Sequence, residues 1–130
     1  MATSKEWYEL RTLVAERKFD EAEALLALIP SLRSAVNGMG ETMLHYLAVE
    51  NDVEGVSWLS SHGFDVNTRN AFGTPVAFEV AQLDYKELLQ WFISNGADVN
   101  CRDGRGQNIK EYVLQFRHED IAKYLESLGL

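Results

Sequence analysis

The chain has 130 residues, with 12 basic and 20 acidic side chains and a formal net charge of −8. Hydrophobic residues make up 46% of it and charged residues 25%, a composition typical of one globular domain with enough apolar side chains for a core. The acidic charge argues against a nucleic acid as the main partner, because phosphate binding needs a basic face. No apolar run approaches the roughly 18 residues of a membrane-spanning helix, so we expect no membrane partner either.

The start of the chain and its cysteine content bear on the compartment. Residues 1–6 lead into a charged amphipathic stretch and not into an apolar signal segment, so we expect no export. Cys101 is the only cysteine and cannot form an internal disulfide, which suits a reducing compartment. Both features favour a cytoplasmic protein.

One phrase of the sequence occurs twice, at an offset of 33 in the numbering, as from Gly63 to Gly96. Residues 61–74 read SHGFDVNTRNAFGT and residues 94–107 read SNGADVNCRDGRGQ. The same offset relates several further columns of residues, and agreement among many columns is a far stronger signal than one motif. These columns are Gly40, Gly73 and Gly106; Gly63, Gly96 and Gly129; and Trp58, Trp91 and Tyr124.

The first unit, residues 1–35, keeps the apolar spacing of the later units but not their glycines. Going back by one period from Ala48 leads to Ala15, whereas going back from Gly63 leads to Pro30. Atypical end units are expected of a stacked array, since an end unit must show one face to water. We therefore predict helices that cap the array at its N-terminal end.

Each later unit predicts a pair of helices. In residues 36–68 the apolar side chains of Val53, Val56 and Leu59 follow a helical spacing, and the shorter segment 42–50 precedes them. The following units repeat this arrangement, with turn residues between the two segments. The glycine after each second helix suits a left-handed C-terminal cap, where a side chain would cost about 1 kcal/mol.

The repeated unit resembles the ankyrin repeat. The length of the period, together with Gly-Glu-Thr-Met-Leu-His at 40–45 and Gly-Ala-Asp-Val-Asn at 96–100, carries the resemblance. It implies an all-α fold, an ankyrin-repeat solenoid of stacked helix-turn-helix units with projecting hairpin fingers. The chain then divides into N-terminal cap helices at 1–35, repeats at 36–68 and 69–101, and a C-terminal capping repeat at 102–130.

Two units depart from the family pattern. The last copy keeps Gly106 and has the apolar Ile109 in place of Met43, but it loses the rest of the motif, as befits a C-terminal cap. The copy at Gly73 departs in another way. The sequence Gly73-Thr74-Pro75 brings Thr-Pro one residue early and lacks the histidine of the motif. Either the turn is one residue shorter there or the Thr-Pro pair is coincidental. In the unit that keeps the motif, the resemblance implies that Thr42 and His45 hydrogen-bond locally and connect neighbouring repeats.

The sequence offers no constellation for catalysis or metal binding. His45, His62 and His118 have no cysteine or histidine at i+3 or i+4, whereas a zinc site needs convergent ligands. A Gly-x-Ser-x-Gly motif is absent, and Gly104-Arg105-Gly106 fits a flexible hairpin tip better than a phosphate loop. We therefore expect no catalytic residues, no cofactor, no metal and no enzymatic activity.

The aromatic residues divide into two groups. Trp58, Trp91 and Tyr124 follow the period, so we expect most of each ring to fill the interface between stacked repeats. Phe72 falls in a turn and Phe116 late in a first helix. By the resemblance, both places line the concave surface of the array. Phe72 is either an anchor for a partner or a clasp against the neighbouring finger.

The charges are also unevenly placed. Residues 34–68 contain no Lys or Arg but several acidic side chains, whereas Arg69, Arg102 and Arg105 fall on the fingers. A surface with basic fingertips and an acidic patch near Glu41 steers a protein partner into one register. Alternatively, these charges only keep a small domain in solution.

The leading hypothesis is a non-enzymatic module that binds one protein partner through its concave face and fingers. An array with no attached effector acts by covering its partner, so a stand-alone inhibitor or immunity-type blocker is the sharper version. The acidic charge favours a partner with a basic contact face, and we expect a monomer.

The alternative is a structural scaffold or adaptor subunit of a larger complex. It predicts a second hydrophobic surface on the N-terminal helices, around Trp7, Tyr8, Leu10 and Leu13.

The expected contact residues combine aromatic and methionine anchors, arginine clamps for carboxylates, and adaptable amides. They are Met39, Glu41, Glu50, Arg69, Phe72, Gln82, Arg102, Arg105, Gln107 and Phe116.

Overall fold

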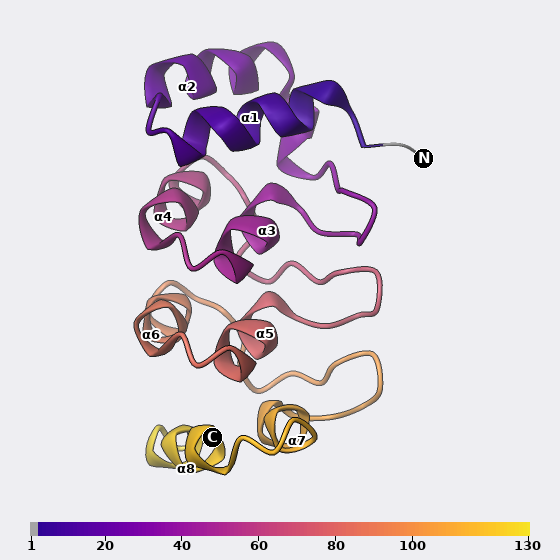
Figure 1. Ribbon diagram of the computed structural model, residues 1–130, viewed down its shortest axis with the longest axis vertical. Coiled ribbons are helices and arrows are strands. Elements are labelled where there is room, and N and C mark those ends of the chain that lie inside the picture. Colours follow the sequence, from indigo (N-terminus) through magenta and orange to yellow (C-terminus); the bar gives the residue numbers. More distant parts are fainter. Residues whose placement is uncertain (1–2) are drawn as a thin grey trace.

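The computed structural model describes residues 3–130 as helix pairs stacked in four layers (Figure 1). The first layer is α1 (Lys5–Ala15) with α2 (Phe19–Leu28), followed by a short 3₁₀ helix, η1 (Pro30–Arg33). The later layers are α3 (Met43–Val49) with α4 (Val53–Ser61), α5 (Val76–Gln82) with α6 (Lys86–Ser94), and α7 (Ile109–Leu114) with α8 (Glu119–Ser127). The all-α solenoid of helix pairs is thus confirmed. Within residues 3–130 no helix combines the length and apolar character that crossing a bilayer requires.

The two helices of each pair are joined through one residue in the left-handed conformation. Arg17, Asn51, Asp84 and Arg117 have φ values from 59° to 63°. Asn and Asp tolerate this conformation better than other residues with a side chain, which explains two of the four. The recurrence of the feature in every layer shows that the N-terminal layer is built on the same plan as the others. It also confirms the turn predicted between the two segments of each unit.

Pro75 explains the irregular unit. It stands directly before α5, as Thr42 stands directly before α3, so the repeat offset holds and the turn is not shortened. The Thr-Pro pair is therefore coincidental. Thr42 caps α3 by accepting a hydrogen bond from the His45 N–H, which Pro75 has no side-chain oxygen to match.

The inner helices α3, α5 and α7 bury a larger share of their residues than the outer helices do, because neighbouring layers cover them. In α5, five of the seven residues are buried, and α5 packs against both α3 and α7. The outer helices α4, α6 and α8 are amphipathic and bury one face each.

The surface predicted on the N-terminal helices is largely absent. Trp7 is 1% and Leu10 0% exposed, and Leu13 is partly buried, which leaves Tyr8 as the exposed member of that group. The indole N–H of Trp7 donates to the Ala35 carbonyl at 3.2 Å, and its ring contacts Tyr46 of α3 edge-on. These residues cap the stack instead of offering a free apolar face, so that prediction is wrong for Trp7 and Leu10.

The period-matched aromatic residues lie on the outer helices and are half-buried. The ring of Trp58 stacks on Phe19 of α2, with centroids 5.2 Å apart and an interplanar angle of 12°. In the last layers the Tyr124 hydroxyl accepts a hydrogen bond from the Gln90 amide at 2.6 Å. Trp58 and Tyr124 thus each bridge two layers, as predicted, although none of the rings is fully enclosed.

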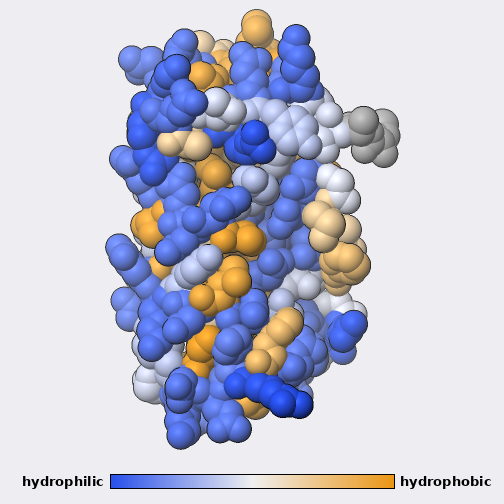
Figure 2. Space-filling view, viewed as in Figure 1, coloured by the Kyte–Doolittle hydropathy of each residue, from blue (hydrophilic) through white to orange (hydrophobic). Residues whose placement is uncertain are grey.

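Three fingers, residues 36–42, 69–75 and 102–108, project from one edge of the stack (Figure 1). Neighbouring fingers touch through the backbone: Ala71 N–H donates to the Met39 carbonyl at 3.0 Å, and Gly104 N–H donates to the Gly73 carbonyl at 3.1 Å. On the face seen in Figure 2, a small apolar patch lies on the upper part of this edge and hydrophilic side chains lie below it. The fingers therefore form one continuous ridge and not three independent loops.

Gly40 lies very close to the neighbouring finger. A Cβ atom there would lie 2.5 Å from the Ala71 nitrogen, whereas a Cβ atom at Gly106 would meet nothing within 4 Å. The two glycines share almost the same backbone conformation, with φ values of 75° and 78°. Substituting Gly106 therefore measures only the cost of placing a side chain at a residue with positive φ. Substituting Gly40 adds the cost of pushing two fingers apart.

We predict that Gly106→Ala lowers the free energy of unfolding by about 1 kcal/mol and that Gly40→Ala lowers it by about 1–3 kcal/mol more. Urea unfolding of both variants measures the difference. Equal losses would contradict the close contact between the first two fingers.

An ion pair ties the first layer to the second. The Arg17 guanidinium donates two hydrogen bonds to the Asp52 carboxylate, at 2.9 and 2.6 Å, and Asp52 also caps α4 through the Gly55 N–H. Burial raises the pKa of Asp52, but the hydrogen bonds from Arg17 and Gly55 outweigh it and hold the pKa below its ordinary value of 3.8. The charged form of Asp52 therefore stabilises the folded state above that pH.

We predict that Asp52→Asn, which keeps an N-cap but removes the charge, lowers the free energy of unfolding by about 1 kcal/mol at pH 7. Because the folded-state pKa is depressed, this difference disappears as the pH falls below 3.8 and Asp52 becomes protonated in both states. Denaturant titrations from pH 7 to pH 2.5 measure it. Glu54→Gln is the control, since Glu54 also pairs with Arg17 but is 63% exposed and contributes little. A difference that persists at the lowest pH would refute the assignment.

Candidate functional site

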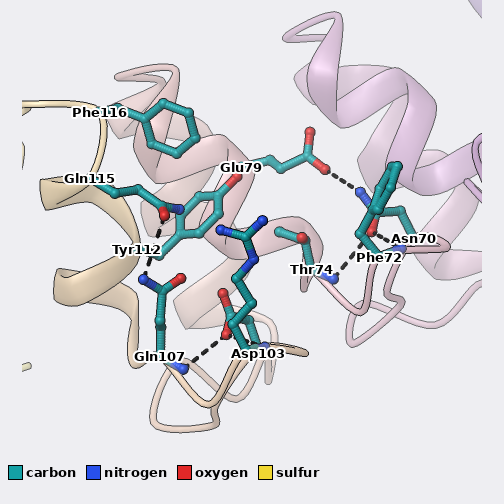
Figure 3. Close-up of a pocket in the computed structure, with 10 residues that line it drawn as sticks. Asn70, Phe72, Thr74, Glu79, Asp103, Gln107, Tyr112, Gln115 and Phe116 are labelled. Carbon is teal, nitrogen blue, oxygen red and sulfur yellow. Dashed lines mark hydrogen bonds between the residues drawn. The ribbon is translucent and has the colours of Figure 1, made fainter.

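A groove of about 590 Å³ lies in the angle between the fingers and the inner helices (Figure 3). The resemblance to ankyrin repeats implies that this angle is the concave side of the array. Two exposed aromatic rings, Phe72 and Phe116, lie at opposite ends of the groove, with Glu79 and Tyr112 between them (Figure 3). We call it the finger groove, and its lining residues are Asn70, Phe72, Thr74, Glu79, Asp103, Arg105, Gln107, Tyr112, Gln115 and Phe116.

The finger backbone sets the positions of the groove's rim. The Asn70 side-chain oxygen accepts from the backbone N–H groups of Phe72 and Thr74, at 2.9 and 3.1 Å. Asp103 does the same one unit later, accepting from Arg105 and Gln107 at 2.9 Å each. Side chains that hydrogen-bond their own backbone in this way rigidify turns. The exposed tips, Phe72 and Arg105, are therefore presented by ordered loops.

Glu79 forms the floor of the groove. Its Oε1 atom accepts from the Asn70 amide at 2.8 Å and from His45 Nε2 at 3.0 Å. His45 is fully buried, and its main chain is capped by Thr42, whose hydroxyl also contacts Thr68 at 3.3 Å. These contacts join two layers and a finger. They confirm that Thr42 and His45 act as structural connections between units.

Tyr112 forms an aromatic wall next to Glu79. Its ring meets Phe116 edge-on at 5.2 Å and contacts the buried Phe78 at 5.7 Å. Burial, reinforced by the carboxylates of Glu79 and Asp103, raises the pKa of the Tyr112 phenol to about 12. Both named charges are negative, so each makes the electrostatic potential at this wall more negative.

Four of the ten predicted contact residues meet in this groove: Phe72, Arg105, Gln107 and Phe116. Phe72 is 70% and Phe116 is 44% exposed. Phe116 does not lie in a helix as predicted, because α7 ends at Leu114, but the turn that follows still directs it to the groove.

The other predicted contact residues lie elsewhere. Arg69 and Arg102 donate to the carbonyls of Gly73 and Gly106 within their own fingers, at 3.1 and 2.9 Å. Arg102 also lies 3.5 Å from the carboxylate of Glu111. Met39 is an exposed tip of the first finger, Glu41 accepts from Asn37 at its base, Glu50 lies beside α1, and Gln82 lies 3.5 Å from His118.

Two family models match the chain. One, described as "Ankyrin repeat", matches residues 39–71, and the other, described as "Ankyrin repeats (many copies)", matches residues 78–126; together they cover more than half of the sequence. The chain belongs to the ankyrin repeat family. A comparison with curated proteins gave no match. Ankyrin repeats are in general protein–protein interaction modules of a non-enzymatic type.

One cluster in this ankyrin array has the side chains of a metal site. Possible ligand atoms of Glu41, His45 and Glu79 lie within 4.8 Å of one another. A metal-bound imidazole normally donates its second N–H to an acceptor, but Nδ1 of His45 is buried without a partner among residues 3–130. With its proton on Nε2, His45 instead donates to Glu79 and leaves Nδ1 uncharged. The donor set therefore fits an inter-repeat hydrogen bond better than a metal.

Sequence reasoning missed Glu79, Asp103 and Tyr112. Glu79 stands where the period places Tyr46 and Tyr112, and a charged residue in an aromatic column was the available signal. Asp103 stands in the same column as Asn37 and Asn70, whose role is to hold the finger. Its acid side chain adds a charge to that structural position.

We predict that the pKa of Tyr112 is about 12 in the native chain and falls in Glu79→Gln, because one of the two charges that oppose phenolate formation is removed. NMR of the labelled tyrosine rings against pH, with Tyr112→Phe for assignment, measures it. Since the raised pKa favours the neutral phenol, folded-state stability is lost as the pH rises above 10.

The control is Glu87→Gln, on the exposed face of α6, which should leave the Tyr112 pKa unchanged. A Tyr112 pKa of 10 in the native chain, or a Tyr112 pKa that does not change in Glu79→Gln, would contradict the negative potential of the groove.

Proposed function

We propose that this chain binds a protein partner through the finger groove and acts without catalysis. The observation that carries the proposal is the presence of two exposed aromatic rings, from different repeats, at the ends of one ordered groove. Aromatic side chains are among the commonest energetic anchors of protein interfaces. A ring that only filled the core would be buried, so the exposure of these two rings points to a contact outside the chain. The rim of polar side chains around them is typical of a recognition surface.

The partner's contact face is basic in this proposal. The chain carries a net charge of −8, and the groove holds two carboxylates against one guanidinium. Opposite charges speed encounter and fix the register of docking. Affinity should therefore fall as the salt concentration rises.

A blocking role is the finer form of the same proposal. Every helix within residues 3–130 belongs to the stack, so this part of the chain acts on a partner by covering its surface. An inhibitor or immunity-type protein works in this way. Loss of the partner's own activity on stoichiometric addition of the chain is the test of this role.

A scaffold role is the second candidate, and one observation favours it. The outer helices hold a shallow apolar groove of about 550 Å³, lined mainly by Phe19, Val53, Trp58 and Trp91. This surface, and not the buried Trp7 and Leu10, is where a second subunit would dock.

We predict that the double variant Phe72→Ala/Phe116→Ala loses a partner captured by the native chain, with affinity reduced at least tenfold for each anchor. Stability should change by no more than about 0.5 kcal/mol, since both rings are exposed. Affinity capture with mass spectrometry, followed by titration of the identified partner, measures both effects.

The matched control is Leu28→Ala, which removes an 80% exposed apolar side chain from α2, outside the groove. Capture by this variant should equal that by the native chain. A partner that survives the double variant would overturn the groove proposal and favour the outer-helix surface.

A further inference from the structure

We propose that the finger groove accepts an arginine side chain of the partner, with its guanidinium against the free oxygen of Glu79. This inference rests on the proposed function and names the chemistry of the segment that enters the groove.

The unsatisfied groups on the floor of the groove are hydrogen-bond acceptors. Oε1 of Glu79 already accepts two hydrogen bonds, but no donor of the described chain reaches Oε2. Asp103 uses Oδ1 for two backbone N–H groups, and its Oδ2 is likewise free of donors from residues 3–130. Oε1 of Gln107 is buried and has no partner in that part of the chain. Of these three acceptors, Gln107 Oε1 is the buried one, and leaving it unpaired is the costliest. A ligand that pairs with all three must present several donors.

The charge of the groove favours a cationic donor. Glu79 and Asp103 contribute two negative charges near the Tyr112 wall, and Arg105 contributes one positive charge at the exposed rim. No carboxylate of the described residues lies within ion-pair distance of Arg105, so its guanidinium neutralises neither acid directly. The two acids therefore keep their charges, and the Arg105 side chain is exposed at the rim.

The walls of the groove suit arginine better than lysine. Tyr112 and Phe116 form an aromatic surface at one end and Phe72 at the other, with the acids between them (Figure 3). A guanidinium is planar, is weakly hydrated, stacks on aromatic faces and presents five donors in one plane. An ammonium group is compact and strongly hydrated, and it satisfies fewer of these acceptors at once.

The test uses the 15N-labelled full chain and three small probes that require no knowledge of the partner. N-acetylarginine amide should shift the amide resonances of residues 70–79 and 103–112 in a saturable manner. N-acetylcitrulline amide, which has nearly the same shape but no charge, should bind at least threefold more weakly. N-acetylglutamate amide should cause no shift in these segments.

Variants of the chain locate the effect. Glu79→Gln keeps the acceptor for Asn70 and His45, and it should reduce the affinity for N-acetylarginine amide at least threefold. Glu87→Gln, on α6, should leave that affinity unchanged. Arg105→Ala should keep or raise it, because a competing positive charge has gone.

Equal binding of the arginine and citrulline probes, or no binding of either, would overturn the inference. So would binding of the glutamate probe that depends on Arg105. If these results came with a partner whose capture still required Phe72 and Phe116, the proposed function would stand and the arginine inference alone would fall. The probe comparison needs no variant, so it remains decisive even if Glu79→Gln is unstable.

Discussion

Packing of each helix pair on the next is the constraint from which the rest of this structure follows. The inner helices bury residues on faces that no single pair can cover, as α5 shows by burying Val76 and Phe78 completely between α3 and α7. Stability in such an array is shared between neighbours, so each layer must keep the same length and the same turn. The constant repeat period reflects this requirement. The fingers stack on one another because the helix pairs to which they are joined are stacked.

A regular scaffold frees particular positions for recognition. The repeat period aligns Tyr46, Glu79 and Tyr112 in one column, and Glu79 is the acid among these three residues. Hydrogen bonds from His45 and Asn70 fix that acid in one orientation. The same contacts that join two layers therefore position the Glu79 carboxylate on the groove floor. Structure and recognition share these side chains, so their individual effects must be separated by conservative substitutions.

The sequence predicts the helices, turns and stacking well, because a periodic signal averages over local exceptions. It identifies Phe72 and Phe116 as non-periodic and exposed, yet it places Phe116 in a helix that ends two residues earlier. It does not reveal Glu79 or the free acceptors beside it, since these depend on which side chains pair across layers. His45 and Glu79 belong to different repeats, and no pattern in the chain links them. The capping role of Trp7 and Leu10 is missed for a similar reason: helical spacing marks an apolar face without saying what covers it.

The central claim is that partners dock on the concave side, where the fingers meet the inner helices. Hydrogen–deuterium exchange of the chain with and without its captured partner tests this most directly. The account predicts slowed exchange of the finger amides in residues 70–74 and 103–107, with α2, α4 and α6 unchanged. Protection confined to those outer helices, with the fingers exchanging as in the free chain, would contradict it.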